Sequence, residues 1–180
     1  MAAKTYLKVG RPAPDFTIAD AKGSTFRLAD YKGKQSVVLV FLRYVGCPIC
    51  QLALHDLKDT YDQFKTRGAE VVAFVQSPRE TIEKSGDLSI FPFRLIPDPD
   101  GEIYKIYGVG DRGVAGIINA NTVLRDVQAI ARGYKQGKME GNMWQLPGDF
   151  IVDKNGFLKL ARMGKNAGDN LRPDQLLGYL

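Results

Sequence analysis

The amino-acid sequence predicts an α/β domain built on a mostly parallel sheet. Two short runs rich in β-branched residues, 37–42 and 69–75, are typical of strands that are buried on both faces. Between them, from Gln51 to about Lys65, leucine and aromatic residues recur at three- and four-residue intervals, which predicts an amphipathic helix. A helix-start pattern follows at Ser77-Pro78. This β-α-β-α order predicts parallel strands that are joined by right-handed crossovers.

Length and composition indicate one domain, over residues 1–180. A chain of 180 residues with 44% apolar residues is long enough to bury a substantial core. The net charge is +5, but the basic residues are dispersed, so we expect no nucleic-acid partner. No apolar run exceeds strand length, and residues 1–6 lack the apolar segment of a secretory signal. We therefore expect a cytoplasmic protein without a membrane partner.

The N-terminal part is predicted to add a β-hairpin to this core. Residues 9–16 contain two prolines and should be extended. Two short runs, 16–19 and 25–28, flank a turn near Lys22-Gly23, and 28–31 fits one helical turn.

The C-terminal half is predicted to contain a short strand at 93–96, a brief helix at 102–107 and a glycine-rich loop at 110–116. A hairpin follows, with strands 150–153 and 157–161 on either side of an Asn-Gly turn, and a terminal helix over 173–180 completes the chain.

Residues 119–135 are predicted to form the second long helix. Its apolar residues recur at helical spacing, so we expect them to form a buried stripe: Val123, Leu124, Val127, Ile130, Ala131 and Tyr134. The basic residues between them should form a solvated face.

Both cysteines lie in Cys47-Pro48-Ile49-Cys50, where the first buried strand passes into its helix. In a cytosolic α/β chain, C-x-x-C spacing indicates a redox pair. The positive end of the helix dipole favours a thiolate, and the nearby Arg43 could strengthen this effect. With two cysteines and a single histidine, His55, the chain cannot close a four-ligand structural zinc site by itself. We therefore predict no metal and no cofactor.

Several segments together resemble the peroxiredoxin superfamily of alkyl hydroperoxide reductases and thiol-specific antioxidants. They are Val9-Gly10 with Ala13-Pro14-Asp15-Phe16, residues 28–41, Asp98-Pro99-Asp100-Gly101-Glu102, Tyr107-Gly108-Val109, and Phe150-Ile151-Val152-Asp153. The spacing from Gly137 through Glu140-Gly141 to Gln145-Leu146 is similar to the C-x-x-C subgroup. The resemblance implies a thioredoxin-like fold, with a central mixed sheet flanked by helices and an N-terminal β-hairpin extension.

The chain departs from the peroxiredoxin pattern at the site of the chemistry. The family motif P-x-x-x-T-x-x-C places its proline at Arg43, its threonine at Cys47 and its peroxide-attacking cysteine at Cys50, while the family arginine falls at Pro147. Losing the threonine and the arginine should slow peroxide reduction severely. Thioredoxin-like reductases instead have a second thiol three residues earlier and a cis-proline opposite, so we expect a cis peptide bond before Pro147.

Three hypotheses follow. The first is a thiol-disulfide oxidoreductase with an antioxidant role, in which, by thioredoxin analogy, Cys47 attacks and Cys50 resolves. The second is a thiol peroxidase that reduces hydroperoxides through Cys50. The third is a redox-sensing or metal-binding module without turnover. The substrate would be a disulfide or a hydroperoxide, and the reductant thioredoxin, glutaredoxin or glutathione. The sequence does not decide whether the chain forms a homodimer.

Other residues are expected to support the pair. Tyr44, Gly46 and Pro48 lie within or beside the motif, and Pro48 should influence the redox potential. Trp144 and Leu146 precede Pro147 and are candidates for a substrate groove. Tyr44 could line that groove or pack in the core.

Overall fold

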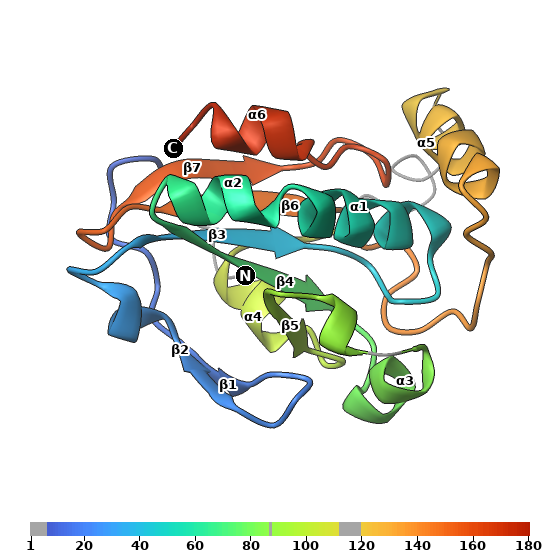
Figure 1. Cartoon of the computed structure of the whole chain (residues 1–180), viewed down its shortest axis with the longest axis horizontal. Coiled ribbons are helices and arrows are strands. Elements are labelled where there is room, and N and C mark those ends of the chain that lie inside the picture. Colours follow the sequence, from blue (N-terminus) through green and yellow to red (C-terminus); the bar gives the residue numbers. More distant parts are fainter. Residues whose placement is uncertain (1–6, 87, 112–119) are drawn as a thin grey trace, which may run out of the picture.

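A five-stranded mixed sheet in the order β5-β4-β3-β6-β7 forms the centre of the fold (Figure 1). The structure is a computed structural model that describes residues 7–86, 88–111 and 120–180. The sheet strands are β3 (Ser36–Phe41), β4 (Ala69–Val75), β5 (Arg94–Pro97), β6 (Gly148–Val152) and β7 (Leu158–Met163). Strands β3, β4 and β5 run parallel, whereas β6 is antiparallel to both β3 and β7. The predicted α/β fold with a mixed sheet is confirmed.

Helices cover both faces of this sheet (Figure 1). They are α1 (Pro48–Asp59), α2 (Tyr61–Thr66), α3 (Arg79–Lys84), α4 (Glu102–Ile106), α5 (Ala120–Ala131) and α6 (Pro173–Leu177), with short 3-10 turns at Leu28–Tyr31 and Leu88–Ile90. One core cluster joins α1, α2 and α6 to the sheet. A second, rich in aromatic rings, joins α4 and the N-terminal hairpin to the opposite face.

The N-terminal hairpin is confirmed as β1 (Thr17–Ala19) and β2 (Thr25–Arg27), which pair antiparallel. Its turn is held by Asp20, whose carboxylate accepts hydrogen bonds from the backbone N–H groups of Lys22 and Ser24. The C-terminal hairpin is confirmed as well. Gly156 has a positive φ of 89° in its turn, a conformation that glycine adopts without strain.

Two details of the first crossover differ from prediction. The expected helix from Gln51 to Lys65 begins earlier, at Pro48, and is interrupted at Thr60, whose hydroxyl donates to the carbonyl of Asp56 at 2.7 Å. Ser77 does not cap α3; its hydroxyl oxygen instead accepts from the backbone N–H of Val45 at 3.1 Å. That hydrogen bond ties the end of β4 to the loop that carries the cysteines.

The prediction for α5 is wrong about its buried face. The helix ends at Ala131, and its large aliphatic residues point to solvent: Val123, Leu124, Val127 and Ile130. Helical spacing identified the stripe but not the side of the helix that meets the protein, because polar contacts decide this orientation. Most of the expected 110–116 loop lies outside the described residues. In the part of the chain that is described, no helix is long and apolar enough to cross a membrane.

Candidate active site

The C-x-x-C motif lies where β3 leaves the sheet and α1 begins. Cys47 is the N-cap of α1, with an extended backbone (φ −83°, ψ 122°), and Pro48 occupies the first turn. A proline fits there because the first N–H groups of a helix have no carbonyl partner within it. Both thiols are free, and both are buried, with Cys47 2% and Cys50 3% exposed.

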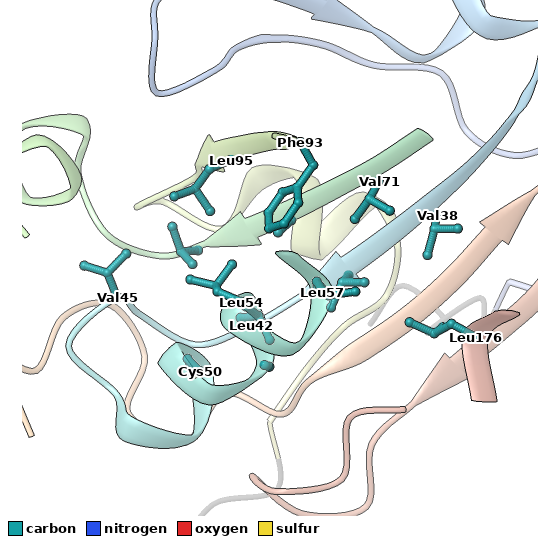
Figure 2. Packing of buried hydrophobic residues seen from close by; sticks show 14 of the residues in the cluster. Val38, Leu42, Val45, Cys50, Leu54, Leu57, Val71, Phe93, Leu95 and Leu176 are labelled. Atoms are coloured by element: carbon teal, nitrogen blue, oxygen red, sulfur yellow. The ribbon is translucent and has the colours of Figure 1, made fainter. Parts of the chain in front are cut away.

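Cys50 faces the core. It belongs to the apolar cluster between α1 and the sheet, where Figure 2 shows it near Leu42 and Leu54. Its sulfur accepts a hydrogen bond from the backbone N–H of Arg43 at 3.4 Å. Burial, together with the neighbouring Cys47, raises the pKa of the Cys50 thiol well above its ordinary value. Cys50 is therefore protonated at neutral pH.

Cys47 is perturbed in the opposite direction. The Cys50 thiol donates a hydrogen bond to the Cys47 sulfur and lowers the pKa of Cys47 from 9.0 to about 7, although burial opposes this effect. The positive charge of Arg43 and the backbone N–H of Cys50 lower it further. A large fraction of Cys47 is consequently thiolate at pH 7, and the thiolate is the reactive form of cysteine.

Arg43 is the cation of the site. Its guanidinium donates to the carbonyl of Met143 at 2.7 Å and lies 5.2 Å from the ring centre of Tyr44. Its Nε atom is buried and has no hydrogen-bond partner among the described residues. Asp126 of α5 lies within electrostatic reach of both Arg43 and Cys47: burial raises the pKa of Asp126, and Arg43 opposes the rise. Asp126 is a site residue that no pattern in the sequence indicated.

The segment 135–143 crosses the loop that carries the cysteines. The close approach requires glycine at two positions, Gly46 in the loop and Gly137 in the segment. The Gly137 N–H donates to the Gly46 carbonyl at 2.7 Å. A Cβ atom at Gly46 would lie 2.6 Å from the carbonyl oxygen of Lys138, and one at Gly137 would lie 3.0 Å from the Gly46 Cα. The segment also reaches Tyr44, whose hydroxyl accepts from the Gln136 amide at 3.2 Å. Tyr44 itself is 2% exposed, so it packs in the core and does not line a groove.

The prediction for Pro147 is wrong. The peptide bond before it is trans, since the described residues contain no cis peptide bond. The chain continues extended into β6, where the Pro147 carbonyl accepts from the Gly164 N–H at 2.8 Å. The proline ring packs on Gly164, where a Cβ atom would lie 2.6 Å from the Pro147 Cγ. Pro147 thus packs on the segment that follows β7.

The proposed groove also needs correction. Leu146 is fully buried and belongs to the core, and Trp144 is half-buried. A cavity of about 410 Å³ does lie beside the cysteine loop, but other residues line it. They include Val45, Gly46, Leu54, His55, Phe91 and Lys138. His55 is held there between the rings of Phe91 and Tyr134.

Comparison with known proteins decides the family. The model of the AhpC/TSA family matches residues 9–161. The chain belongs to the AhpC/TSA family. It is 31% identical over 127 residues to the thiol-disulfide oxidoreductase ResA of Geobacillus kaustophilus, covering 69% of this chain and 71% of ResA. It is 34% identical over 128 residues to alkyl hydroperoxide reductase E of Mycobacterium tuberculosis, covering 70% of this chain and 83% of that protein.

Solved structures agree on the fold. The crystal structure of peroxidoxin BcpB from Mycobacterium tuberculosis aligns with a TM-score of 0.67 at 20% identity, over 97% of this chain and 96% of that one. The predicted thioredoxin-like architecture and the resemblance to peroxiredoxins are therefore confirmed. The family member described here is a thiol-dependent oxidoreductase, as its relatives are.

Proposed function

We propose that this AhpC/TSA protein is a thiol-disulfide oxidoreductase with an antioxidant role, which cycles between the Cys47/Cys50 dithiol and its disulfide. One observation carries the proposal: within a single turn of α1, the pKa of Cys47 is lowered to about 7 while that of Cys50 is raised well above its ordinary value. The first sulfur is suited to attack as a thiolate, and the second is suited to wait as a thiol until the mixed disulfide forms.

The reaction then has two displacements. The Cys47 thiolate attacks one sulfur of a substrate disulfide, a new S–S bond forms to Cys47, and the other substrate sulfur leaves as a thiolate that takes up a proton. Cys50 then loses its proton and attacks the Cys47 sulfur, which releases the second substrate thiolate. The substrate gains two electrons and two protons, and the Cys47–Cys50 disulfide remains. A dithiol, or two thiols, must reduce it again.

Arg43 and the N-terminus of α1 support the first step. Each stabilises the negative charge of the Cys47 thiolate before it attacks the substrate disulfide. Pro48 holds the first turn of α1, and Gly46 permits the close approach of Gly137. Because Cys47 is only 2% exposed, the proposed attack requires a conformational change that exposes its sulfur to the substrate.

A thiol peroxidase that acts through Cys50 is the second candidate. Family membership and the similarity to alkyl hydroperoxide reductase E favour it. Against it, Cys50 has the raised pKa, so little of it is thiolate at neutral pH. Stopped-flow reaction of the reduced protein with hydrogen peroxide and with an organic hydroperoxide tests this candidate. Rates no faster than those of free cysteine would exclude it.

The partners belong to the same proposal. The substrate is a disulfide or, for the second candidate, a hydroperoxide, and the reductant comes from the thioredoxin, glutaredoxin or glutathione system. The cytoplasm is the proposed compartment, since its thiol pools would return the pair to the dithiol. For the third candidate, a metal-binding module, the described residues contain no group of three or more His, Cys, Asp or Glu that could hold an ion.

The test is turnover in a disulfide-reduction assay with dithiothreitol as the electron donor. Cys47→Ser should abolish turnover because no attacking thiolate remains, and Cys50→Ser should stop the reaction at the mixed disulfide. If both variants turned over at the rate of the unmodified protein, the proposal would fail. A tightly bound metal in the purified protein, combined with no exchange activity, would support the non-catalytic module instead.

A further inference from the structure

The cavity beside the cysteine loop has the size and the apolar wall of a small-molecule site. Its volume is about 410 Å³, within the range of about 300 to 1,000 Å³ that is common for ligand sites. Three buried aliphatic side chains form its floor, and Figure 2 shows them beside α1: Val45, Leu54 and Leu95. Ile90 and Phe91 extend this apolar wall. Ligand sites are mostly apolar in this way, with a few polar groups that fix the orientation of the ligand.

His55 belongs to this wall and is held from two sides. Its ring centre lies 5.6 Å from that of Phe91 and 5.1 Å from that of Tyr134. Burial lowers the pKa of His55, so its ring is largely uncharged at neutral pH. The imidazole therefore adds an aromatic surface to the cavity without adding a full charge.

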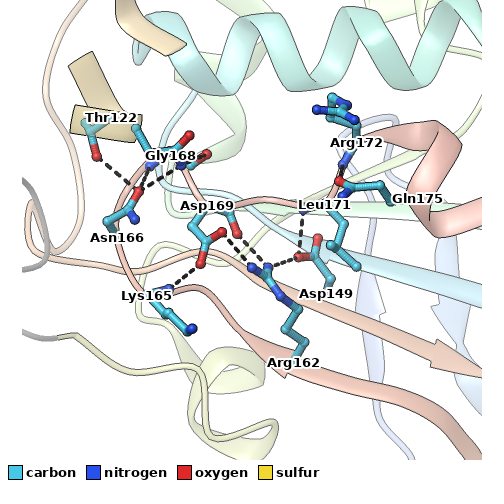
Figure 3. Close-up of polar contacts among 11 residues, drawn as sticks. Thr122, Asp149, Arg162, Lys165, Asn166, Gly168, Asp169, Leu171, Arg172 and Gln175 are labelled. Atoms are coloured by element: carbon cyan, nitrogen blue, oxygen red, sulfur yellow. Dashed lines mark hydrogen bonds and ion pairs between the residues drawn. The ribbon is translucent and has the colours of Figure 1, made fainter. Parts of the chain in front are cut away.

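Polar contacts of α5 fix the position of Tyr134, which follows the end of that helix. Asp56 of α1 forms an ion pair with Arg132 at 2.6 Å. At the start of α5, the Thr122 hydroxyl donates to the side-chain oxygen of Asn166 at 3.2 Å, within the polar network that Figure 3 shows. Because these contacts hold both ends of the helix, the wall that His55 and Tyr134 form is built before a ligand arrives.

The rim of the cavity is positively charged. Lys84, at the end of α3, and Lys138 both line it, and none of the described lining residues is Asp or Glu. Lys138 pairs with Glu140 at 3.5 Å, but the Glu140 side chain is only 6% exposed and does not line the cavity. Two ammonium groups and one nearby carboxylate leave one net positive charge. A single carboxylate on a ligand would balance this charge.

The cavity reaches the residue that precedes Cys47. Val45 and Gly46 line it from the cysteine loop, and Gly137 lines it from the segment that crosses this loop. The Gly137 N–H donates to the Gly46 carbonyl at 2.7 Å. A ligand in the cavity therefore lies against the loop that carries the attacking sulfur.

We propose that this cavity binds the substrate of the Cys47/Cys50 pair, and that the substrate is a small disulfide with an apolar body and a carboxylate. The inference rests on the proposed thiol-disulfide function and specifies its substrate class. The apolar body lies on the aliphatic floor, the carboxylate lies at Lys84 and Lys138, and the disulfide meets Cys47 when the contact between the two glycines opens. The substrate S–S bond breaks and the Cys47–Cys50 bond forms. The protein dithiol supplies two electrons and two protons, so two substrate thiols are released.

Binding without chemistry is the first test. The probe is dithiodibenzoate, an aromatic disulfide with a carboxylate on each half, titrated calorimetrically into the full chain with Cys47→Ser and Cys50→Ser. It should bind, and cystamine, which carries ammonium groups instead, should bind about tenfold more weakly or not at all. Adding Lys84→Met and Lys138→Met together should raise the Kd for dithiodibenzoate about tenfold, whereas Lys84→Arg should keep it. No binding of dithiodibenzoate, or a Kd unchanged by the double Met variant, would overturn the proposal.

Lys154→Met is the matched control for the charge. Lys154 is also an exposed lysine, but it follows Val152, which pairs with Val37 near the start of β3, whereas the cysteines follow the end of that strand. This variant should leave the Kd unchanged. The apolar wall is tested with Ile90→Ser, which should weaken the binding of dithiodibenzoate about threefold. Dithiodipropionate has the carboxylates but little apolar body and should bind about tenfold more weakly. Equal affinity for the two disulfides would contradict the role of the wall.

Single-turnover reduction separates this inference from the proposed function. The reduced protein with both cysteines should release thiobenzoate from dithiodibenzoate at a rate that saturates with its concentration. Lys84→Met with Lys138→Met should raise the half-saturating concentration about tenfold and leave the saturated rate within about twofold. If cystamine and dithiodibenzoate reached half-saturation at equal concentrations, the substrate class would be wrong while the redox function stood. If dithiodibenzoate bound to the serine variant but the reduced protein released no thiobenzoate, the redox function would fail while the binding site stood.

Discussion

Removing the Cys50 thiol should change the reactivity of Cys47 by a calculable amount. Donation from Cys50 is the largest contribution that lowers the pKa of Cys47 from 9.0 to about 7. In Cys50→Ala this donor is lost, and we expect the pKa to return toward 9.0. At pH 7 the thiolate fraction would fall from about one half to about 1%. A thiolate of higher pKa is intrinsically more nucleophilic, by about eightfold over two units, so the alkylation rate should fall about sixfold.

The assay is the rate of iodoacetamide alkylation of Cys47 as a function of pH, with the modified residue identified by mass spectrometry. The variant should overtake the unmodified protein above about pH 8, where the growing thiolate fraction and the eightfold higher nucleophilicity together exceed the rate of the fully ionised unmodified thiol. Cys50→Ser is the matched control because its hydroxyl can still donate to the Cys47 sulfur. A pKa near 7 in Cys50→Ala would refute the reasoning, because Arg43 and the helix N-terminus would then be sufficient.

Three further predictions concern the surroundings of the pair. Arg43→Met should raise the pKa of Cys47, though less than Cys50→Ala does, because Arg43 contributes less to the lowered pKa. The rate of alkylation as a function of pH measures this pKa, and Arg43→Lys is the charge-conserving control. An unchanged pKa in Arg43→Met would contradict the role of Arg43. Gly46→Ala should destabilise the protein by about 2 kcal/mol, since its Cβ meets backbone 2.6 Å away. Gly33→Ala, with open space around the added Cβ, should cost only about 1 kcal/mol of backbone strain. Equal losses in urea unfolding would argue against the close approach at Gly46. Burial raises the pKa of Asp149 from 3.8 to about 6, so its contribution to folding is present below about pH 4 and is lost as the pH rises through 6. The unfolding free energy should therefore fall by about 2 kcal/mol from this group between pH 4 and 7, and this fall should be absent in Asp149→Asn. Equal slopes in the two proteins would contradict this prediction.

Local sequence patterns predicted the elements in which each face has a single environment, either buried or exposed. The buried strands β3 and β4 and the Asn-Gly hairpin were predicted for this reason, and Cys47 and Cys50 were found because their spacing has few structural uses. The errors arose where the local sequence fits two arrangements equally well and tertiary contacts determine which of them forms. The stripe on α5 could face in or out, and its ion pairs with Asp56, a residue distant in sequence, decide the orientation.

The supporting residues of the site were harder to predict for the same reason. Asp126 and Gly137 lie about 80 and 90 residues after Cys47. No motif includes Asp126, and the spacing that includes Gly137 does not predict its contact with Gly46. Pro147 occupies the position at which reductases carry a cis-proline, yet its trans peptide bond runs directly into β6. The resemblance predicted a cis-proline at this position, and the structure contradicts that conformation.

The central claim is that Cys47 attacks first and Cys50 resolves, and covalent trapping of substrate measures this directly. Cells that express Cys50→Ser should accumulate mixed disulfides between Cys47 and its partners, because the resolving sulfur is absent. Cells that express Cys47→Ser should yield few, since the remaining Cys50 is buried and protonated. Abundant complexes through Cys50 in Cys47→Ser, with few in Cys50→Ser, would reverse the roles and contradict the mechanism.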